Sequence, residues 1–85
     1  MHFMEHTETQ IRAVLRDHGR LNKDISLLDV GSDLYQSGMT SHASVNVMLA
    51  LESLFNVEFP DRMLKRNVFN SIESISSGLR ELTSA

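Results

Sequence analysis

Mostly apolar side chains recur at helical spacing near the start of the chain. Between residues 5 and 18 they fall at positions i, i+3, i+4 and i+7, and the four residues are Ile11, Val14, Leu15 and His18. Such spacing places them on one face of a helix. Gly19 follows directly and is a typical helix stop. The pattern predicts a first helix that ends at His18.

A second stretch carries the strongest signal. Its continuous apolar stripe consists of Val47, Met48, Leu51, Leu54 and Phe55. Burial of five such side chains contributes roughly 8–15 kcal/mol before chain entropy is subtracted. We therefore expect this helix to anchor the domain. The hydroxyl of Thr40 or of Ser41 can cap its start, and Asn56 suits its C-terminal cap.

A third helix is predicted to open at Asn70, whose side chain can cap it while Glu73 reaches back three residues later. Its apolar face consists of Ile72, Ile75, Leu79 and Leu82. Gly78 inside this helix costs about 1 kcal/mol relative to alanine. Ahead of it, Pro60 in "FPD" breaks the chain. The following "DRMLKR" has room for one or two helical turns, with Met63 and Leu64 as the apolar side.

The segment between the first two helices, residues 21–38, is too long for a tight turn. Five side chains can pack it onto a core: Ile25, Leu28, Val30, Leu34 and Tyr35. Long ordered loops in compact domains are usually functional. Only "NVEF" hints at a strand, and it is too short to build a sheet. The predicted fold is all-α: a four-helix bundle of three main helices and one short helix, with a long loop between the first two.

Length and composition favour one small soluble domain. The chain has 85 residues, of which 41% are hydrophobic and 22% charged, and this length has room for a single core. We expect one domain over residues 1–85, with frayed ends at 1–5 and 83–85. No apolar run approaches the roughly 20 residues of a membrane span. The N-terminal "MHFMEHTETQ" lacks the features of a secretory signal, so we expect a cytoplasmic, monomeric protein without membrane contact.

Charge and cysteine content narrow the chemistry. The net charge is −3, and Arg62, Lys65 and Arg66 form only a small cluster that is expected to be a solvated turn. A nucleic-acid partner is therefore not expected, since phosphate binding needs a basic patch. There is no cysteine, which excludes disulfides, thiolate zinc sites and a cysteine nucleophile. Any thiol chemistry must be performed by an attached group.

A pair of histidines and a set of methionines are possible metal ligands, but neither is expected to bind a metal. His2 and His6 lie four residues apart, a spacing that can bind a metal on a helix, but no third ligand is near them and we expect solvated side chains. Four methionines, namely Met4, Met39, Met48 and Met63, are expected to fill the core or its rim. No metal site is therefore expected.

The stretch "SGMTSHASV", residues 37–45, is the candidate functional motif. It places Ser41 where the second helix begins. A helix N-terminus carries about half a positive charge and several unpaired N–H groups, and it therefore accommodates a phosphate. Gly38, Ala43 and Ser44 add no bulk around this position. Ser41 is thus either a plain helix cap or the exposed attachment point of a phosphodiester.

Ser41 and the following "HASVNVMLALESLFNVEFPDRML" resemble the second half of an acyl or peptidyl carrier protein. In that family a G-x-D-S-L motif presents the serine that receives 4′-phosphopantetheine. Residues 38–42 occupy those five positions, and the resemblance runs from about residue 33 to 79. The matching features are Gly38, Ser41, Leu51, Glu52, Phe55 and the "FPD" break. The sequence departs at Thr40, where aspartate is usual, and at His42, where leucine is usual.

The resemblance implies a function without catalysis by the chain itself. The run "DLYQSGMTSHASVNVMLALESLFNVEFPD" is similar to the small bacterial aminoacyl carrier proteins, which are charged by amino acid:carrier-protein ligases resembling class II seryl-tRNA synthetases. By this resemblance a phosphopantetheinyl transferase modifies Ser41. The arm's thiol then holds glycine or alanine as a thioester, for delivery to an unknown downstream acceptor.

The same resemblance suggests a partner-binding surface on the second helix. Fatty-acid carriers display a row of acids there, whereas Glu52 is the only acid of this helix. The residues expected to face solvent and contact partners are Thr40, His42, Ala43, Val45, Asn46 and Leu49. Val45 and Leu49 could equally be half-buried core residues. The sequence therefore predicts a poor partner for fatty-acid synthase enzymes.

Three alternatives stay open at this point. The chain could carry fatty-acid or polyketide-type acyl groups instead of amino acids. It could be a small hydrolase that uses Ser41 with a histidine and Asp33, although no oxyanion hole is recognisable and adjacent His42 points about 100° away from Ser41. It could also be a helical adaptor without a prosthetic group.

Overall fold

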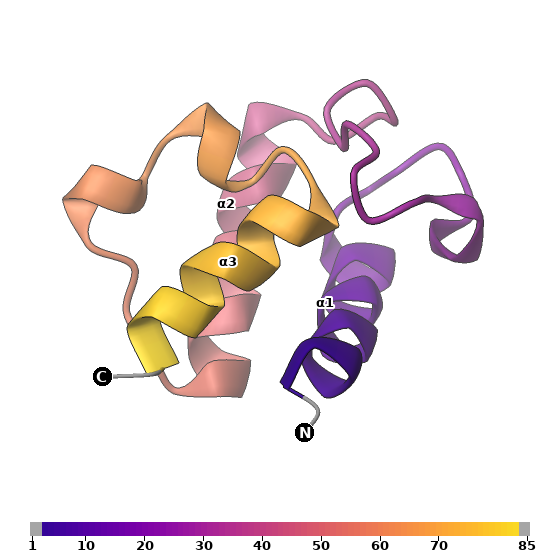
Figure 1. Ribbon diagram of the computed structural model, residues 1–85. Coiled ribbons are helices and arrows are strands. Elements are labelled where there is room, and N and C mark those ends of the chain that lie inside the picture. The colour runs from indigo at the N-terminus through magenta and orange to yellow at the C-terminus, as the bar shows by residue number, and fades with distance from the viewer. Residues whose placement is uncertain (1–2, 84–85) are drawn as a thin grey trace.

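The computed structural model describes residues 3–83, which form three α-helices joined by loops that contain short 3₁₀ turns (Figure 1). The helices are α1 (Phe3–His18), α2 (Ser41–Phe55) and α3 (Ile72–Thr83). The 3₁₀ turns are η1 (Ile25–Leu27), η2 (Asp61–Met63) and η3 (Arg66–Val68). Helix α1 packs against both α2 and α3, and α3 crosses α2 in the view of Figure 1. The described residues contain no strand, so the all-α prediction is confirmed.

The predicted short fourth helix is present only as two separate three-residue 3₁₀ turns, η2 and η3. They are separate because Leu64 and Lys65, which lie between them, do not have helical backbone geometry. Met63 and Phe69 on either side are buried, and the ring of Phe69 meets Phe59 edge-to-face at 5.2 Å. Both apolar side chains lie in the core, Met63 at the end of η2 and Phe69 directly after η3.

The core draws on every segment of the fold. Its members from the helices lie at the predicted helical spacing, and those from the loops fill the space between them. The buried apolar residues are Ile11, Val14, Leu15, Leu28, Leu34, Met39, Ala43, Val47, Leu51, Phe59, Met63, Phe69, Ile72, Ile75 and Leu79. The core is therefore shared between the helices and the loops that join them.

Four residues expected on buried faces are exposed. They are His18, Val30, Leu54 and Leu64. Successive helical residues point about 100° apart, so the inward orientation of Phe55 turns Leu54 outward. In the same way the burial of Met63 leaves Leu64 48% exposed. His18 lies at the end of α1, past the last buried side chain of that helix, and Val30 lies in the loop at the surface.

The start of α3 differs by one residue from the prediction. Ser71, not Asn70, provides the cap: its Oγ accepts a hydrogen bond from the Ser74 N–H at 3.0 Å, and the Ser74 Oγ accepts one from the Ser71 N–H at 3.1 Å. The Glu73 carboxylate does not reach back. Instead the Glu73 N–H donates to the Val30 carbonyl at 2.9 Å, so the long loop satisfies an N–H of the first turn of α3.

The connection over residues 19–40 is held in place by contacts with α1 and with the residues just ahead of α3. The Arg12 guanidinium of α1 donates to the Ile25 carbonyl at 2.7 Å, and Glu8 pairs with the same guanidinium at 3.0 Å. Near the other end, the Leu34 N–H donates to the Asn70 carbonyl ahead of α3 at 2.8 Å. These bonds tie the loop to α1 and to the start of α3.

The loop also closes on itself just before α2. The Asn22 N–H donates to the Ser37 carbonyl at 2.8 Å, and Gly38 follows with a φ of +113°. A Cβ at position 38 would lie only 2.9 Å from the Asn22 nitrogen. Glycine is required here both by its backbone conformation and by this close approach.

The expected fraying of residues 1–5 and 83–85 falls partly outside the described range and stays a prediction, and His2 also lies outside it. His6 is exposed. Among residues 3–83 no helix is long and apolar enough to span a membrane, and no three His, Asp or Glu side chains gather at a metal-binding distance.

Replacing Gly38 by alanine should destabilise the fold by about 1–3 kcal/mol, because alanine at this φ is strained and its methyl group collides with Asn22. Urea unfolding followed by circular dichroism measures the change. Gly31→Ala is the matched control, since a Cβ there meets nothing within 4 Å. It should be neutral or stabilise by at most about 1 kcal/mol. Equal losses for both variants would contradict this account of Gly38.

Candidate functional site

The residues that lead into α2 alternate between the interior and the surface. Ser37 is buried and its hydroxyl donates to the Asp33 carbonyl at 3.1 Å. Met39 is buried in the core, whereas Thr40 and Ser41 are exposed. Ser37 and Met39 are both held in the interior, with Gly38 between them. Their burial fixes the path of the backbone as it enters α2. The orientation of Ser41 is therefore set by the core.

Thr40, not Ser41, is the cap of α2. The Thr40 Oγ1 accepts a hydrogen bond from the Ala43 N–H at 3.0 Å, and its carbonyl accepts from the Ser44 N–H at 2.9 Å. Ser41 is the first residue of the helix. Its hydroxyl forms no hydrogen bond with the other described residues. Ser41 is therefore not the cap of α2, and its hydroxyl is exposed without a hydrogen-bond partner among the described residues.

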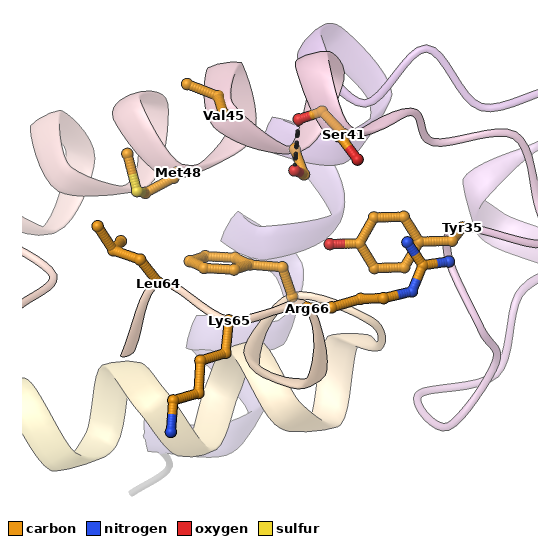
Figure 2. A pocket seen from close by; sticks show the side chains of 9 residues that line it. Tyr35, Ser41, Val45, Met48, Leu64, Lys65 and Arg66 are labelled. Carbon is orange, nitrogen blue, oxygen red and sulfur yellow. Dashed lines mark hydrogen bonds between the residues drawn. The ribbon is translucent and has the colours of Figure 1, made fainter. Parts of the chain in front are cut away.

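A groove of about 280 Å³ begins at Ser41 and runs between α2 and the segment that carries η2 and η3 (Figure 2). Its apolar surface comes from Val45 and Met48 on α2 and from Leu64 and Phe69 opposite them. The remaining lining residues are Tyr35, Ser41, Ser44, Lys65 and Arg66. The Ser44 hydroxyl donates a hydrogen bond to the Ser41 carbonyl at 2.7 Å. The site is thus an exposed hydroxyl beside a narrow apolar groove.

One end of the groove is closed by a stacked pair. The Arg66 guanidinium carbon lies 3.8 Å from the centre of the Tyr35 ring, a cation–π contact. Tyr35 was expected to pack the loop onto the bundle, and its ring is half-buried against the core. The basic cluster was expected to be a solvated turn, and Arg62, Lys65 and Arg66 are all exposed; Arg62 pairs at the surface with Glu81 at 2.8 Å. No sequence signal pairs Tyr35 with an arginine 31 positions away.

The described site does not assemble the hydrolase that the sequence left open. The Asp33 carboxylate accepts hydrogen bonds from the N–H groups of Tyr35 and Gln36, at 2.9 and 3.3 Å, and thereby caps a loop turn. The groove beside Ser41 is lined by neither Asp33 nor a histidine. The Ser41 hydroxyl has no base at hydrogen-bond distance among the described residues.

Residues 10–78 match the family described as "Phosphopantetheine attachment site". The chain belongs to this family. The match covers most of the chain and includes the whole of α2 and the groove. The resemblance found in the sequence is thereby confirmed, and so is the prosthetic group, 4′-phosphopantetheine, for which the family is named.

Individual relatives agree with this assignment. A curated aminoacyl carrier protein from Agrobacterium fabrum (strain C58) is 39% identical over 70 residues, which cover 82% of this chain and 84% of the relative. The structure resembles a chain in the crystal structure of an engineered Bradyrhizobium japonicum glycine:[carrier protein] ligase complexed with carrier protein from Agrobacterium tumefaciens and ATP. The TM-score is 0.88, with 36% identity, 91% of this chain covered and all of the other. A solution structure from Agrobacterium tumefaciens gives a TM-score of 0.70, with 36% identity and coverages of 87% and 89%. The chain is a homologue of aminoacyl carrier proteins.

The geometry around Ser41 fits the prosthetic group of the phosphopantetheine attachment family. The hydroxyl is exposed and free, and the positive end of the α2 dipole favours a phosphodiester at this position. Thr40 replaces the aspartate that is usual in the resembling motif, yet its oxygen still accepts the capping hydrogen bond. The departure at Thr40 therefore preserves the cap. His42 is exposed and does not disturb it.

The expected partner surface of this family member requires one correction. Thr40, His42, Val45 and Leu49 are exposed, and Asn46 is half-buried. Ala43 was expected to face solvent but is fully buried. Ala43, Val47 and Leu51 follow one another at intervals of four residues and form the buried line of α2. The Ala43 side chain is therefore not available to a partner.

Glu52, the one acid of α2, has a structural role in this member of the family. It is half-buried, and its carboxylate accepts a hydrogen bond from the Phe59 N–H at 2.8 Å. This bond ties the end of α2 to the segment after Asn56, which ends the helix with a left-handed φ of 56° as its sequence suggested. The exposed side of α2 around Val45 and Leu49 has no carboxylate for docking.

Removal of the Thr40 hydroxyl and removal of the Ser41 hydroxyl should have different effects on the free energy of unfolding. Thr40→Ala removes the cap of α2 and should lower the free energy of unfolding by about 1 kcal/mol. Ser41→Ala removes a hydroxyl without a partner and should change it by less than about 0.5 kcal/mol. Chemical denaturation of the unmodified proteins measures both values. A larger loss for Ser41→Ala than for Thr40→Ala would contradict the assignment of the cap.

Proposed function

We propose that this chain is an aminoacyl carrier protein whose prosthetic group is attached to Ser41. A phosphopantetheinyl transferase modifies the Ser41 hydroxyl, and an amino acid:carrier-protein ligase then loads a small amino acid, glycine or alanine. The attached group supplies a thiol, which the cysteine-free chain lacks, and holds the amino acid as a thioester. The observation that carries this proposal is the free, exposed Ser41 hydroxyl at the start of α2, within the matched family region.

The residues around Ser41 each contribute to presenting this hydroxyl. Thr40 takes over the capping bond, so modification of Ser41 costs the helix nothing. Gly38 and Met39 fix the direction of the chain from the core side. The dipole of α2 favours the negative charge that modification adds. The chain thus binds no substrate in a closed site and performs no catalysis; it is the substrate of its modifying and loading enzymes.

The proposed partner is a ligase of the kind seen with the A. tumefaciens carrier protein, a glycine:[carrier protein] ligase. We infer that it resembles class II seryl-tRNA synthetases and docks on the side of α2 that exposes His42, Val45 and Leu49, with Thr40 and Asn46 at its edges. An apolar surface of this kind favours docking by burial of hydrophobic side chains instead of charge pairing. We further propose that the protein acts as a cytoplasmic monomer and passes its cargo to a downstream acceptor.

Modification of Ser41 is tested by intact-mass spectrometry. Protein produced together with a phosphopantetheinyl transferase should gain the mass of one phosphopantetheine, and Ser41→Ala should gain none. Ser44→Ala is the matched control, because Ser44 lines the same groove one helical turn away and should still leave Ser41 modified. Modification of the Ser41→Ala protein would refute the assignment. Charging of the modified protein by a malonyl transferase, but not by an amino acid ligase, would move the function to fatty-acid or polyketide acyl groups.

The docking surface is tested by comparing two leucine-to-arginine substitutions, one inside the proposed contact and one outside it. Leu49→Arg places a charge in the proposed ligase contact and should lower kcat/KM for glycine loading at least about tenfold, which corresponds to about 1.4 kcal/mol. Leu27→Arg is the control, since Leu27 is 78% exposed on η1, outside the proposed contact on α2. The assay follows glycine transfer to the modified carrier with saturating ATP. Equal effects of both substitutions would place the contact elsewhere.

A further inference from the structure

The groove beside Ser41 carries charge of the same sign as the amino group of the cargo that the proposed function assigns to the protein. Of its nine lining residues none is acidic, and two, Lys65 and Arg66, are basic. Arg66 stays charged at any ordinary pH and is held in place by its stacking on Tyr35. Figure 2 shows Arg66 over the Tyr35 ring at the Ser41 end, whereas the Lys65 side chain points away from Ser41. The groove therefore combines an apolar surface with one fixed cation near the attachment residue.

A glycyl or alanyl thioester ends in an α-amino group. The pKa of such a group is about 7.7–8.0, so it is mostly protonated below pH 7. Transfer of an ammonium ion to an apolar surface is unfavourable unless a carboxylate compensates for the lost water. Once the arm is attached through the Ser41 oxygen, the groove offers the ammonium only the neutral hydroxyls of Ser44 and Tyr35, and Arg66 repels it. The charged end of the cargo is thus excluded for two independent reasons.

An arm whose far end is uncharged meets neither obstacle. The groove starts at Ser41, so a group attached to that hydroxyl reaches it directly. Its volume of about 280 Å³ lies just below the roughly 300–1,000 Å³ of common ligand pockets, which suits a narrow chain. Met48 is half-buried and flexible and Val45 and Leu64 are about half-exposed, so apolar surface is available to a chain that lies along α2.

We propose that the groove is a charge-selective resting site for the prosthetic arm, which it holds while the arm ends in a thiol or a neutral acyl group and releases when the arm carries a free amino group. This inference rests on the proposed attachment at Ser41. Its consequence is that loading itself frees the arm: the empty carrier keeps its arm against Val45, Met48 and Leu64, and the aminoacylated carrier presents its cargo to solvent and to the acceptor.

The test compares two cargoes of the same shape. Glycyl and propionyl groups differ only in an ammonium in place of a methyl group. Both are installed on Ser41 as stable amide-linked arm analogues, alongside the natural thiol arm. At pH 6.5, nuclear Overhauser contacts from the arm to the methyl groups of Val45, Met48 and Leu64 should appear for the thiol and propionyl forms. They should be at least fivefold weaker for the glycyl form. Equal contacts for glycyl and propionyl, or none for any form, would overturn the proposal.

A charge-reversal pair tests the role of Arg66. Arg66→Glu should restore contacts between the glycyl arm and the groove to within about twofold of the propionyl form. Lys23→Glu changes the net charge equally but lies outside the groove, and it should leave the glycyl arm released. Amide spectra of both variants verify the fold. Restored contacts in both variants, or in neither, would refute the assignment to Arg66.

These outcomes separate the two proposals. If Ser41 accepts no phosphopantetheine, the proposed function and this inference fail together. If Ser41 is modified and the ligase loads glycine, yet glycyl and propionyl arms behave alike, only the resting site is refuted.

Discussion

The structure depends on the closure of the long loop just ahead of α2. The hydrogen bond from the Asn22 N–H to the Ser37 carbonyl brings two parts of the loop so close that only glycine fits at position 38. Met39 is then drawn into the core, Thr40 caps the helix, and Ser41 is left outside. The exposure of this hydroxyl is thus a result of packing two residues earlier, and the loop is as much a part of the site as α2.

The main elements of the fold could be predicted from sequence because helical periodicity reports which side chains share a face. Val47 and Leu51, or Ile72, Ile75 and Leu79, are buried as their spacing indicates. The errors arise where two neighbours compete for one buried position, as Leu54 and Phe55 do, and where a tertiary contact decides local geometry. The Glu73 N–H, which bonds to the Val30 carbonyl 43 positions earlier, belongs to the second kind. A tertiary contact also matters at Gly78, where a Cβ would lie 3.1 Å from the Met63 methyl group. Glycine weakens the helix there, but it allows Met63 to pack closely against it.

Part of the candidate site could likewise be predicted from the sequence, and part of it could not. Ser41 was recognisable because hydroxyl and small residues precede a strong helix and resemble a known motif. Its groove was not, since the walls come from residues 35, 41–48 and 64–69, and only folding brings these segments together. The burial of Ala43 was missed because an alanine among serine and histidine carries no sign of which way it faces. The contact between Tyr35 and Arg66 is invisible for the same reason: neither residue type predicts a partner.

The bond between the Glu52 carboxylate and the Phe59 N–H has one more consequence. It holds the only acidic group that α2 possesses against the segment after the helix, so the exposed side of α2 around Val45 and Leu49 carries no carboxylate. A partner that meets this side of α2 can therefore bury apolar side chains there, but it finds no carboxylate on it to pair with a basic residue.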